Sequence, residues 1–193
     1  ASKIKKLFLD NFKDFNEIDI AGPGFLNIRL EKSYLKKIVD KILIQKNTFG
    51  SANNNKKYNI EFVSANPTGP MHVGHCRGAI FGDVLANLLK FNGNQVVKEY
   101  YINDYGNQIA NFTKSVYLRI REILYKEKFK NNSDLYPGEY IVDIAKKIIK
   151  EKSHIDFSTQ ININKILEEE SLRHSMIMIK EDLGLLGIKH DIF

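Results

Sequence analysis

The feature that most constrains how this chain can fold is a proline- and glycine-rich loop between a short apolar strand and a long amphipathic helix. It lies within Tyr58–Gly93, which reads YNIEFVSANPTGPMHVGHCRGAIFGDVLANLLKFNG. Tyr58–Val63 is predicted to be a strand, and the two prolines and the glycine that follow it exclude regular structure. A helix is predicted from about His72 to Phe91, and Asn92-Gly93 is a natural stop for it. The loop therefore joins the end of a strand to the N-terminus of a helix.

A second strand after this helix indicates the α/β class. Gln95–Ile102, QVVKEYYI, is predicted to be that strand. A strand, a helix of this length and a second strand form a right-handed βαβ unit with parallel strands. The apolar residues of the helix predict its buried side, which consists of Ile80, Val84, Leu85, Leu88 and Leu89.

The segments before this unit predict a small α+β region. A helix is expected from Ile4 to about Phe15, with Ile4, Leu7, Phe8 and Phe12 near one face. After a break at Gly22-Pro23-Gly24, Phe25–Leu30 alternates as a half-buried strand does. Ser33 is an expected N-cap for a helix over about Tyr34–Gln45. Gly50–Lys57 is polar and rich in turn formers, which predicts a domain boundary there.

The segments after the second strand are predicted to be mainly helical. The predicted helices run from the turn Asn103–Gly106 to about Lys128, over Glu139–Lys152 and over about Ile163–Leu183. Gly184 and Gly187 are expected to end the last of them. The tail Ile188–Phe193 has no terminal cap or polar end, so the chain is expected to be a fragment of a longer protein.

Composition adds few constraints. The net charge of +6 permits a polyanionic partner such as a nucleic acid, although a lysine-rich composition accounts for it equally well. No run of eighteen apolar residues and no secretory signal occur, so no membrane span is expected. The single cysteine, Cys76, cannot form an internal disulfide, which fits a cytoplasmic location.

The loop and the turn after the second strand are expected to meet. In open α/β sheets, ligands bind beyond the carboxyl ends of the strands, where Ser64–Met71 and Asn103-Asp104 both lie. The helix start offers free N–H groups and a positive dipole end, which suit an anion. His72 and His75 share one helix face, and Gly74 between them lets a ligand approach the backbone. This pattern predicts a phosphate-handling site in which imidazole N–H groups stabilise developing charge.

Other interpretations of these residues stay open. Two histidines at a helix start can be caps or packing residues, and Asn103 and Asp104 are good N-caps for the next helix. A lone glutamate in a strand, such as Glu61, usually faces solvent. A zinc site needs at least three protein ligands, and the other histidines lie far off in the sequence, so no metal site is expected.

The motif Ala65–His75, ANPTGPMHVGH, resembles the "HIGH" region of class I aminoacyl-tRNA synthetases. More narrowly, the stretches around it resemble arginyl-tRNA synthetases. These stretches are Ile60–Pro70 (IEFVSANPTGP), Arg77–Ala79, Gly82-Asp83 and Tyr101–Gln108 (YINDYGNQ). The likeness is close over about residues 58–115, and Pro23–Asn27 resembles the end of that family's additional N-terminal domain.

The resemblance implies a role for each matching residue. The HIGH region comprises Ala65, Asn66, Pro67, Thr68, Gly69, Pro70, Met71, His72, Val73, Gly74 and His75. Within it, the catalytic residues would be His72 and His75, and ATP would be bound by Thr68, Gly69, Pro70, His72, Val73, Gly74 and His75. Arginine would be bound by Glu61, Ser64 and Asn66, with possible substrate contacts from Asn103, Asp104 and Gln108. A carboxylate is the natural planar partner for the arginine guanidinium.

The resemblance also implies an architecture. It implies half of a Rossmann-like parallel-sheet nucleotide-binding domain with a helical insertion, preceded by a small α+β segment. The implied divisions are residues 1–52, the end of the additional tRNA-binding domain; 53–128, the first half of the catalytic domain; and 129–193, the helical insertion. The second half of the nucleotide fold, with its "KMSKS"-like loop, does not occur in the chain, so this piece alone is expected to be inactive.

The implied activity is that of an arginine–tRNA ligase, a cytoplasmic enzyme expected to be a monomer. Its substrates would be arginine, tRNA(Arg) and ATP with Mg²⁺, with no tightly bound metal. Two alternatives remain. One is another H-x-G-H nucleotidyltransferase acting on a small acid or nucleotide, and the other is a non-catalytic tRNA-binding module derived from a synthetase.

Overall fold

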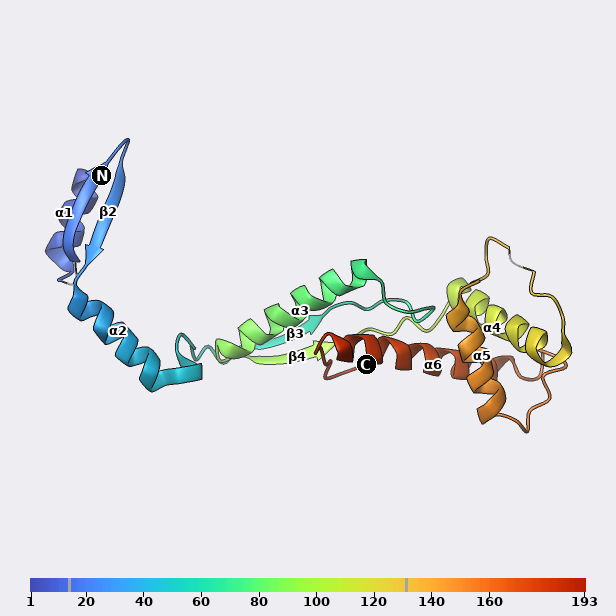
Figure 1. The fold of residues 1–193 in the computed structure, drawn as a ribbon. Helices are drawn as coiled ribbons and strands as arrows, with labels where there is room; N and C mark the ends of the chain where they lie inside the picture. Colours follow the sequence, from blue (N-terminus) through green and yellow to red (C-terminus); the bar gives the residue numbers. More distant parts are fainter. Residues whose placement is uncertain (14, 131) are drawn as a thin grey trace. The chain divides into compact units, whose positions relative to one another are not determined.

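The N-terminal residues Ala1–Ala52 form a unit of their own, built on an antiparallel hairpin. The computed structural model describes residues 1–13, 15–130 and 132–193. The elements of this unit are α1 (Ser2–Asn11), β1 (Phe15–Ala21), β2 (Phe25–Leu30), α2 (Lys32–Gln45) and the 3₁₀ turn Lys46–Thr48. β1 and β2 pair antiparallel, and α1 packs on β1 (Figure 1). The strand Phe25–Leu30 was predicted, whereas β1 was not.

Two predicted boundaries in this unit are wrong. The first helix ends at Asn11 rather than near Phe15, because Phe12 is already extended and Phe15 pairs with Leu30 in the hairpin. Leaving the helix there lets the rings of Phe8 and Phe15 pack 5.5 Å apart. Ser33 does not cap α2, whose N-cap is Glu31; Ser33 lies inside the helix.

The second unit, Asn53–Phe193, begins with the predicted βαβ arrangement. β3 (Lys57–Glu61) and β4 (Gln95–Glu99) are parallel neighbours, and α3 (Val73–Phe91) connects them (Figure 1). The parallel pairing is confirmed, although both strands are shorter than predicted. Because their carboxyl ends lie side by side, the loop after β3 and the segment after β4 start from the same edge.

α3 lies so close to the chain beyond β3 that only small residues fit between them. Its buried residues are Ala79, Gly82 and Ala86. A Cβ atom on Gly82 would lie 2.2 Å from Cγ of Phe62, so no side chain fits there. The prediction that Ile80, Val84 and Leu88 face the core is wrong: they are 50%, 59% and 55% exposed. Leu85 and Leu89, also predicted to be buried, are half-buried.

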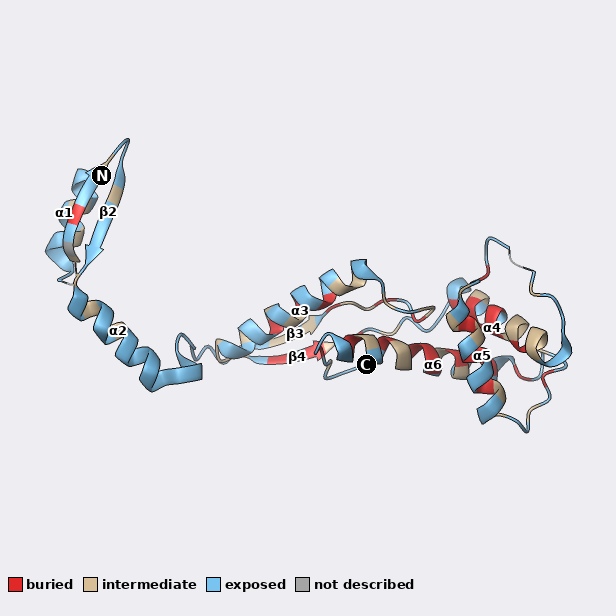
Figure 2. Cartoon of the chain, viewed as in Figure 1, coloured by how far each residue is buried: buried red, intermediate tan, exposed pale blue. Residues whose placement is uncertain are grey.

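The rest of this unit is a helical segment with its own core. Its helices are α4 (Asn107–Tyr125), α5 (Glu139–Glu151) and α6 (Asn164–Leu185). Buried apolar residues from the three helices meet in one cluster (Figure 2), which includes Phe112, Val116, Ile120, Ile141, Ile144, Ile148 and Leu167. This cluster fixes α5 against α4. Among the described residues, no helix combines the length and apolarity that crossing a membrane requires.

α6 also reaches the sheet, and the chain after it runs beside β4. Gly184 lies within α6, and Gly187, with a φ of 72°, follows its end. Ile179 and Leu183 pack in a second cluster with Phe62 and Tyr100. Beyond the helix, the Ile192 N–H donates to the Lys98 carbonyl at 3.1 Å, and the Ile192 carbonyl accepts from the Tyr100 N–H at 3.0 Å. The carboxyl end of β4 is therefore held from both sides.

Candidate active site

The loop after β3 begins with a strained turn. Val63 and Ser64 have φ values of 68° and 39°, a left-handed backbone that a β-branched residue such as valine rarely adopts. The hydroxyl of Ser64 accepts a hydrogen bond from the Tyr101 N–H at 3.0 Å. This bond ties the turn to the chain that leaves β4, so the predicted substrate residue Ser64 also has a structural partner.

Three side chains from other elements hold the backbone of the loop. The bonds are Tyr100 Oη to the Ala65 carbonyl (2.7 Å), Tyr140 Oη to the Thr68 carbonyl (2.9 Å) and the Met71 N–H to Asp182 Oδ2 (3.1 Å). Their sources are the segment after β4, the first turn of α5 and the last turns of α6. The loop has no regular structure of its own, so these bonds fix its path.

The two histidines are stacked at the start of α3. His72 is the N-cap, and its Nδ1 accepts from the Gly74 N–H at 3.1 Å. The His75 Nδ1 accepts from the His72 N–H at 3.3 Å, and the ring centroids are 3.7 Å apart. Because both Nδ1 atoms are acceptors, a neutral ring carries its proton on Nε2. The capping interpretation is confirmed for His72, and both Nε2–H groups remain available as donors.

The surroundings of His75 favour its neutral form. Burial, followed by the charge of His72, lowers the pKa of His75. A Cβ atom on Gly74 would lie 2.9 Å from Cε1 of His72, so glycine allows that ring to fold over the first turn. The space beside Gly74 is therefore taken by His72, whereas the sequence had suggested that it admits a ligand.

A cavity of about 400 Å³ lies in front of the histidines. Its lining comprises Asn66, Thr68, Gly69, Pro70, His72, His75, Gln108, Tyr136 and Tyr140. Its size is within the range of small-molecule sites. Tyr136 and Tyr140 were not predicted, because they follow the loop by about seventy residues and nothing in the local sequence marks them as site residues.

The loop and the start of α4 meet through a chain of amides. Asn66 donates from Nδ2 to Gln108 Oε1 at 2.6 Å, and its Oδ1 accepts from Asn103 Nδ2 at 3.1 Å. Three of the predicted substrate residues are thus brought together. The capping prediction for Asn103 and Asp104 is wrong, because the N-cap of α4 is Gly106 and no side chain caps it.

A family model described as "tRNA synthetases class I (R), catalytic domain" matches residues 38–152, more than half of the chain. The chain belongs to this family. The Rossmann-like α/β class predicted from the sequence is confirmed.

Curated relatives named "Arginine--tRNA ligase" match almost the entire chain. The protein from Pelagibacter ubique is 51% identical over 100% of the chain, and that from Ehrlichia ruminantium (strain Welgevonden) is 49% identical over 98%. In both, the match covers 34% of the relative's length. The chain therefore spans about a third of the relatives it matches.

Solved structures agree with this family. One is a structure from Campylobacter jejuni that is assigned as an arginyl-tRNA synthetase. The match covers 84% of the present chain and 36% of the Campylobacter chain, with a TM-score of 0.76 and 35% sequence identity. The match to the Thermus thermophilus arginyl-tRNA synthetase covers 98% of the present chain and 32% of the Thermus chain, with a TM-score of 0.56. At 21% identity, the second likeness shows the fold alone.

In this family member, Glu61 lies apart from the histidine cavity. It ends β3, is exposed and sits opposite Glu99 in the parallel register. Glu99 accepts a hydrogen bond from Asn59, two residues earlier on β3. Glu61 is not among the residues that line the cavity. Two acidic residues at the paired ends of β3 and β4 provide a negative location that suits a cation.

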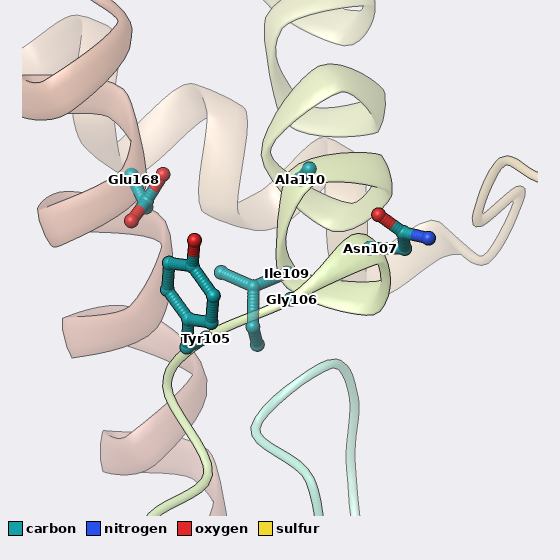
Figure 3. Close-up of a pocket in the computed structure, with 6 residues that line it drawn as sticks. All are labelled: Tyr105, Gly106, Asn107, Ile109, Ala110 and Glu168. Carbon is teal, nitrogen blue, oxygen red and sulfur yellow. The ribbon is translucent and has the colours of Figure 1, made fainter.

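A smaller hollow of about 240 Å³ lies at the start of α4. It is lined by Tyr105, Gly106, Asn107, Ile109, Ala110 and Glu168. In Figure 3, the hydroxyl end of Tyr105 is directed toward the Glu168 carboxylate, and Asn107 points away. The negative charge of Glu168 disfavours a phosphate, so this hollow is a poorer anion site than the histidine cavity.

One further cluster of potential metal ligands lies between α5 and α6. Glu151, Glu170 and His174 offer ligand atoms within 4.8 Å of one another. Arg173 pairs with both carboxylates, and Lys152 lies 2.8 Å from Glu170. These cations already balance the acidic charge. The prediction that no tightly bound metal is needed stays a prediction.

Proposed function

We propose that the chain is the part of an arginine–tRNA ligase that holds ATP for amino-acid activation. The observation that carries this proposal is the stacked His72–His75 pair, whose Nε2–H groups are free at a helix N-terminus that borders a cavity. The complete enzyme would join arginine to ATP, forming arginyl-adenylate and pyrophosphate. It would then transfer the arginyl group to the terminal ribose of tRNA(Arg).

The residues of the cavity suit the first step. A carboxylate oxygen of arginine attacks the α-phosphorus, the bond to the bridging oxygen breaks, and pyrophosphate leaves with that electron pair. Negative charge grows on the phosphate oxygens in the transition state. The Nε2–H groups of His72 and His75 and the positive end of α3 would stabilise that charge without moving a proton.

We assign ATP to the histidine cavity through residues of the loop and of the first turn of α3. Of these residues, Thr68, Gly69, Pro70, His72 and His75 line the cavity, and Val73 and Gly74 belong to the same helix start. No aspartate or glutamate is among the described residues that line the cavity. Mg²⁺ would therefore enter with the triphosphate, as part of the substrate, and be held by phosphate oxygens and water.

We assign arginine to the edge formed by the ends of β3 and β4. Glu61, beside Glu99, would pair with the guanidinium. Asn66 would take the α-amino group, because its Oδ1 has a second lone pair beyond the one that Asn103 uses. Ser64 lies between them in the sequence and would complete this set.

We further propose roles for the units. Residues 1–52 would contact tRNA, since ten lysines and arginines oppose six aspartates and glutamates there. Residues 53–128 would form the first half of the catalytic domain, and residues 129–193 the helical insertion. We infer that the enzyme works in the cytoplasm, where its three substrates occur together, and that it is a monomer.

The test is arginine-dependent exchange of pyrophosphate into ATP by the complete protein, with tRNA(Arg) present. We expect exchange with arginine and not with lysine. Exchange that depends on another small acid would favour a different H-x-G-H nucleotidyltransferase. Binding of tRNA without exchange would favour a non-catalytic module. The 193-residue chain by itself should show no exchange.

A further inference from the structure

Tyr140, at the start of α5, touches the nucleotide cavity and the loop at the same time. Its ring lines the cavity, and its hydroxyl donates to the Thr68 carbonyl, 72 residues away in the chain. We propose that Tyr140 is a positioning residue for the nucleotide site. It holds the loop backbone so that the His72–His75 pair faces the cavity. The identity of the ligand rests on the proposed function, whereas the positioning does not.

Tyr140 packs closely against a glycine on each of two sides. A Cβ atom on Gly69 would lie 3.0 Å from its hydroxyl oxygen, and one on Gly138 would lie 2.4 Å from its Cε1. The ring is therefore enclosed between the loop and the residue that precedes α5. Neither glycine has a positive φ, so the close approach of Tyr140, rather than backbone conformation, favours glycine at these positions.

The hydroxyl of Tyr140 keeps its proton and so remains a hydrogen-bond donor. Burial, with a smaller effect from Tyr136, raises the pKa of Tyr140 to about 12. The group therefore stays protonated across the whole physiological range. The Thr68 carbonyl accepts from it, and the Thr68 N–H bonds the Asn66 carbonyl at 2.8 Å. Thr68 thus links Tyr140 to Asn66, the residue that bonds Gln108.

The position of Tyr140 is set by the helical core rather than by the loop. The Tyr136 N–H donates to Ser115 Oγ at 2.9 Å, and its ring meets Phe112 edge-on at 5.8 Å. Ile141, next to Tyr140, is fully buried in the same cluster. Helices α4 and α5 therefore present Tyr140 to the loop as part of a rigid wall.

Tyr140 differs from the other two side chains that hold the loop. Tyr100 and Asp182 bond its two ends, at Ala65 and Met71, and neither lines the cavity. Tyr140 bonds the middle of the loop, at Thr68. Replacement of Tyr140 by phenylalanine keeps the wall and removes only this bond, so positioning can be separated from contact with the ligand.

The first arm of the test is amide hydrogen exchange in the 193-residue chain, a measurement that does not require enzymatic activity. Tyr140→Phe should speed exchange of backbone amides in residues 65–75 by about fivefold, the effect of one ordinary hydrogen bond. Tyr117→Phe is the matched control. It removes a tyrosine hydroxyl bonded at 3.4 Å to another distant carbonyl, that of Ser158, away from the cavity. Unchanged exchange in Tyr140→Phe would overturn the proposal.

The second arm uses the complete ligase. Tyr140→Phe should raise the KM for ATP by about fivefold or more, change the KM for arginine less, and leave the melting temperature close to wild type. Tyr140→Ala should raise the KM for ATP further, while Tyr117→Phe should leave the KM for ATP unchanged. Faster loop exchange without any change in ATP kinetics would also overturn the positioning role. If the wild-type ligase shows no arginine-dependent exchange, the proposed function fails, and the first arm still decides whether Tyr140 holds the loop.

Discussion

The ammonium of Lys98, on β4, lies 2.6 Å from a carboxylate oxygen of Asp83, on α3, and both side chains are largely buried. Asn87 accepts a second bond from the same ammonium at 2.9 Å. This pair fixes how α3 lies on the sheet, and thereby where the helix N-terminus with its histidines points. Removing one partner leaves an unpaired charge in the interior, which destabilises the folded state more than removing both partners does.

Lys98→Met should therefore lower the free energy of unfolding by about 3 kcal/mol. The double variant Lys98→Met/Asp83→Leu should recover most of that loss. Urea denaturation of the three proteins measures both effects. Lys165→Met is the control, because Lys165 and Glu169 form an exposed pair at 3.9 Å and should contribute nothing measurable. Equal loss in the single and double variants would contradict an ion pair of this kind.

Gly82 should not tolerate alanine. The added Cβ would meet Phe62 at 2.2 Å, so α3 has to move away from the sheet. We expect a loss of about 1–3 kcal/mol in unfolding free energy. Gly78 lies one turn earlier on α3 with open space around it, so Gly78→Ala should stabilise the protein by about 0.5–1 kcal/mol. Thermal melts of both variants compare the two, and equal effects would argue against the close approach.

Stability should fall in mild acid because of His190. Its ring packs 4.2 Å from that of Phe62. Burial is the main cause of its lowered pKa and the charge of Lys98 adds to it, whereas the Phe62 backbone and the charges of Asp83 and Asp191 act in the opposite direction. The folded state therefore favours the neutral ring. The contribution of His190 to the free energy of unfolding is complete above the pKa of about 6.5 that the ring has in the unfolded chain. It is lost as the pH falls from that value toward the lower pKa of the folded state.

The measurement is the urea midpoint between pH 7.5 and 5.5. His190→Phe should flatten its pH dependence, because an apolar ring replaces the one that resists protonation. His174 also has a pKa lowered by burial and then by Arg173, so some dependence should remain. A slope that is the same in wild type and His190→Phe would show that this imidazole titrates freely in the folded protein.

His75→Ala should remove much of the adenylation rate in the complete ligase. Loss of one preorganised donor to a developing oxyanion typically lowers kcat by about 10²–10³-fold. The melting temperature should change little, because the His75 side chain caps one exposed N–H group. Pyrophosphate exchange is the measurement, and His154→Ala, at an exposed position, is the control. Normal exchange in His75→Ala would remove the histidine from the mechanism.

Glu61→Gln should impair the use of arginine and spare ATP. Loss of a charge-assisted carboxylate–guanidinium pair should raise the KM for arginine at least about tenfold, with the KM for ATP unchanged. Glu168→Gln, in the smaller hollow, is the matched control. Unaltered arginine kinetics in Glu61→Gln would refute the arginine assignment.

Local sequence was enough to predict the elements that carry the site. The alternation in Phe25–Leu30 and the order strand, Pro/Gly loop, helix and strand over residues 58–102 follow from periodicity and turn chemistry, which act within a few residues. The capping of α3 by His72 was one of two roles left open for that side chain. Local pattern failed where packing overrode it, as on α3, whose large apolar residues turn outward because Gly82 lies against Phe62.

What the sequence by itself determined is therefore the α/β class, the parallel βαβ unit and the segment in which the histidines lie. Only the tertiary structure decided that Asn66 bonds both Asn103 and Gln108, that Tyr136 and Tyr140 wall the cavity, and that Glu61 lies outside it. The physical reason is distance along the chain. Hydrogen bonds such as that from Tyr140 to Thr68 join residues 72 positions apart, and their partners are set by how the helices pack rather than by local propensity.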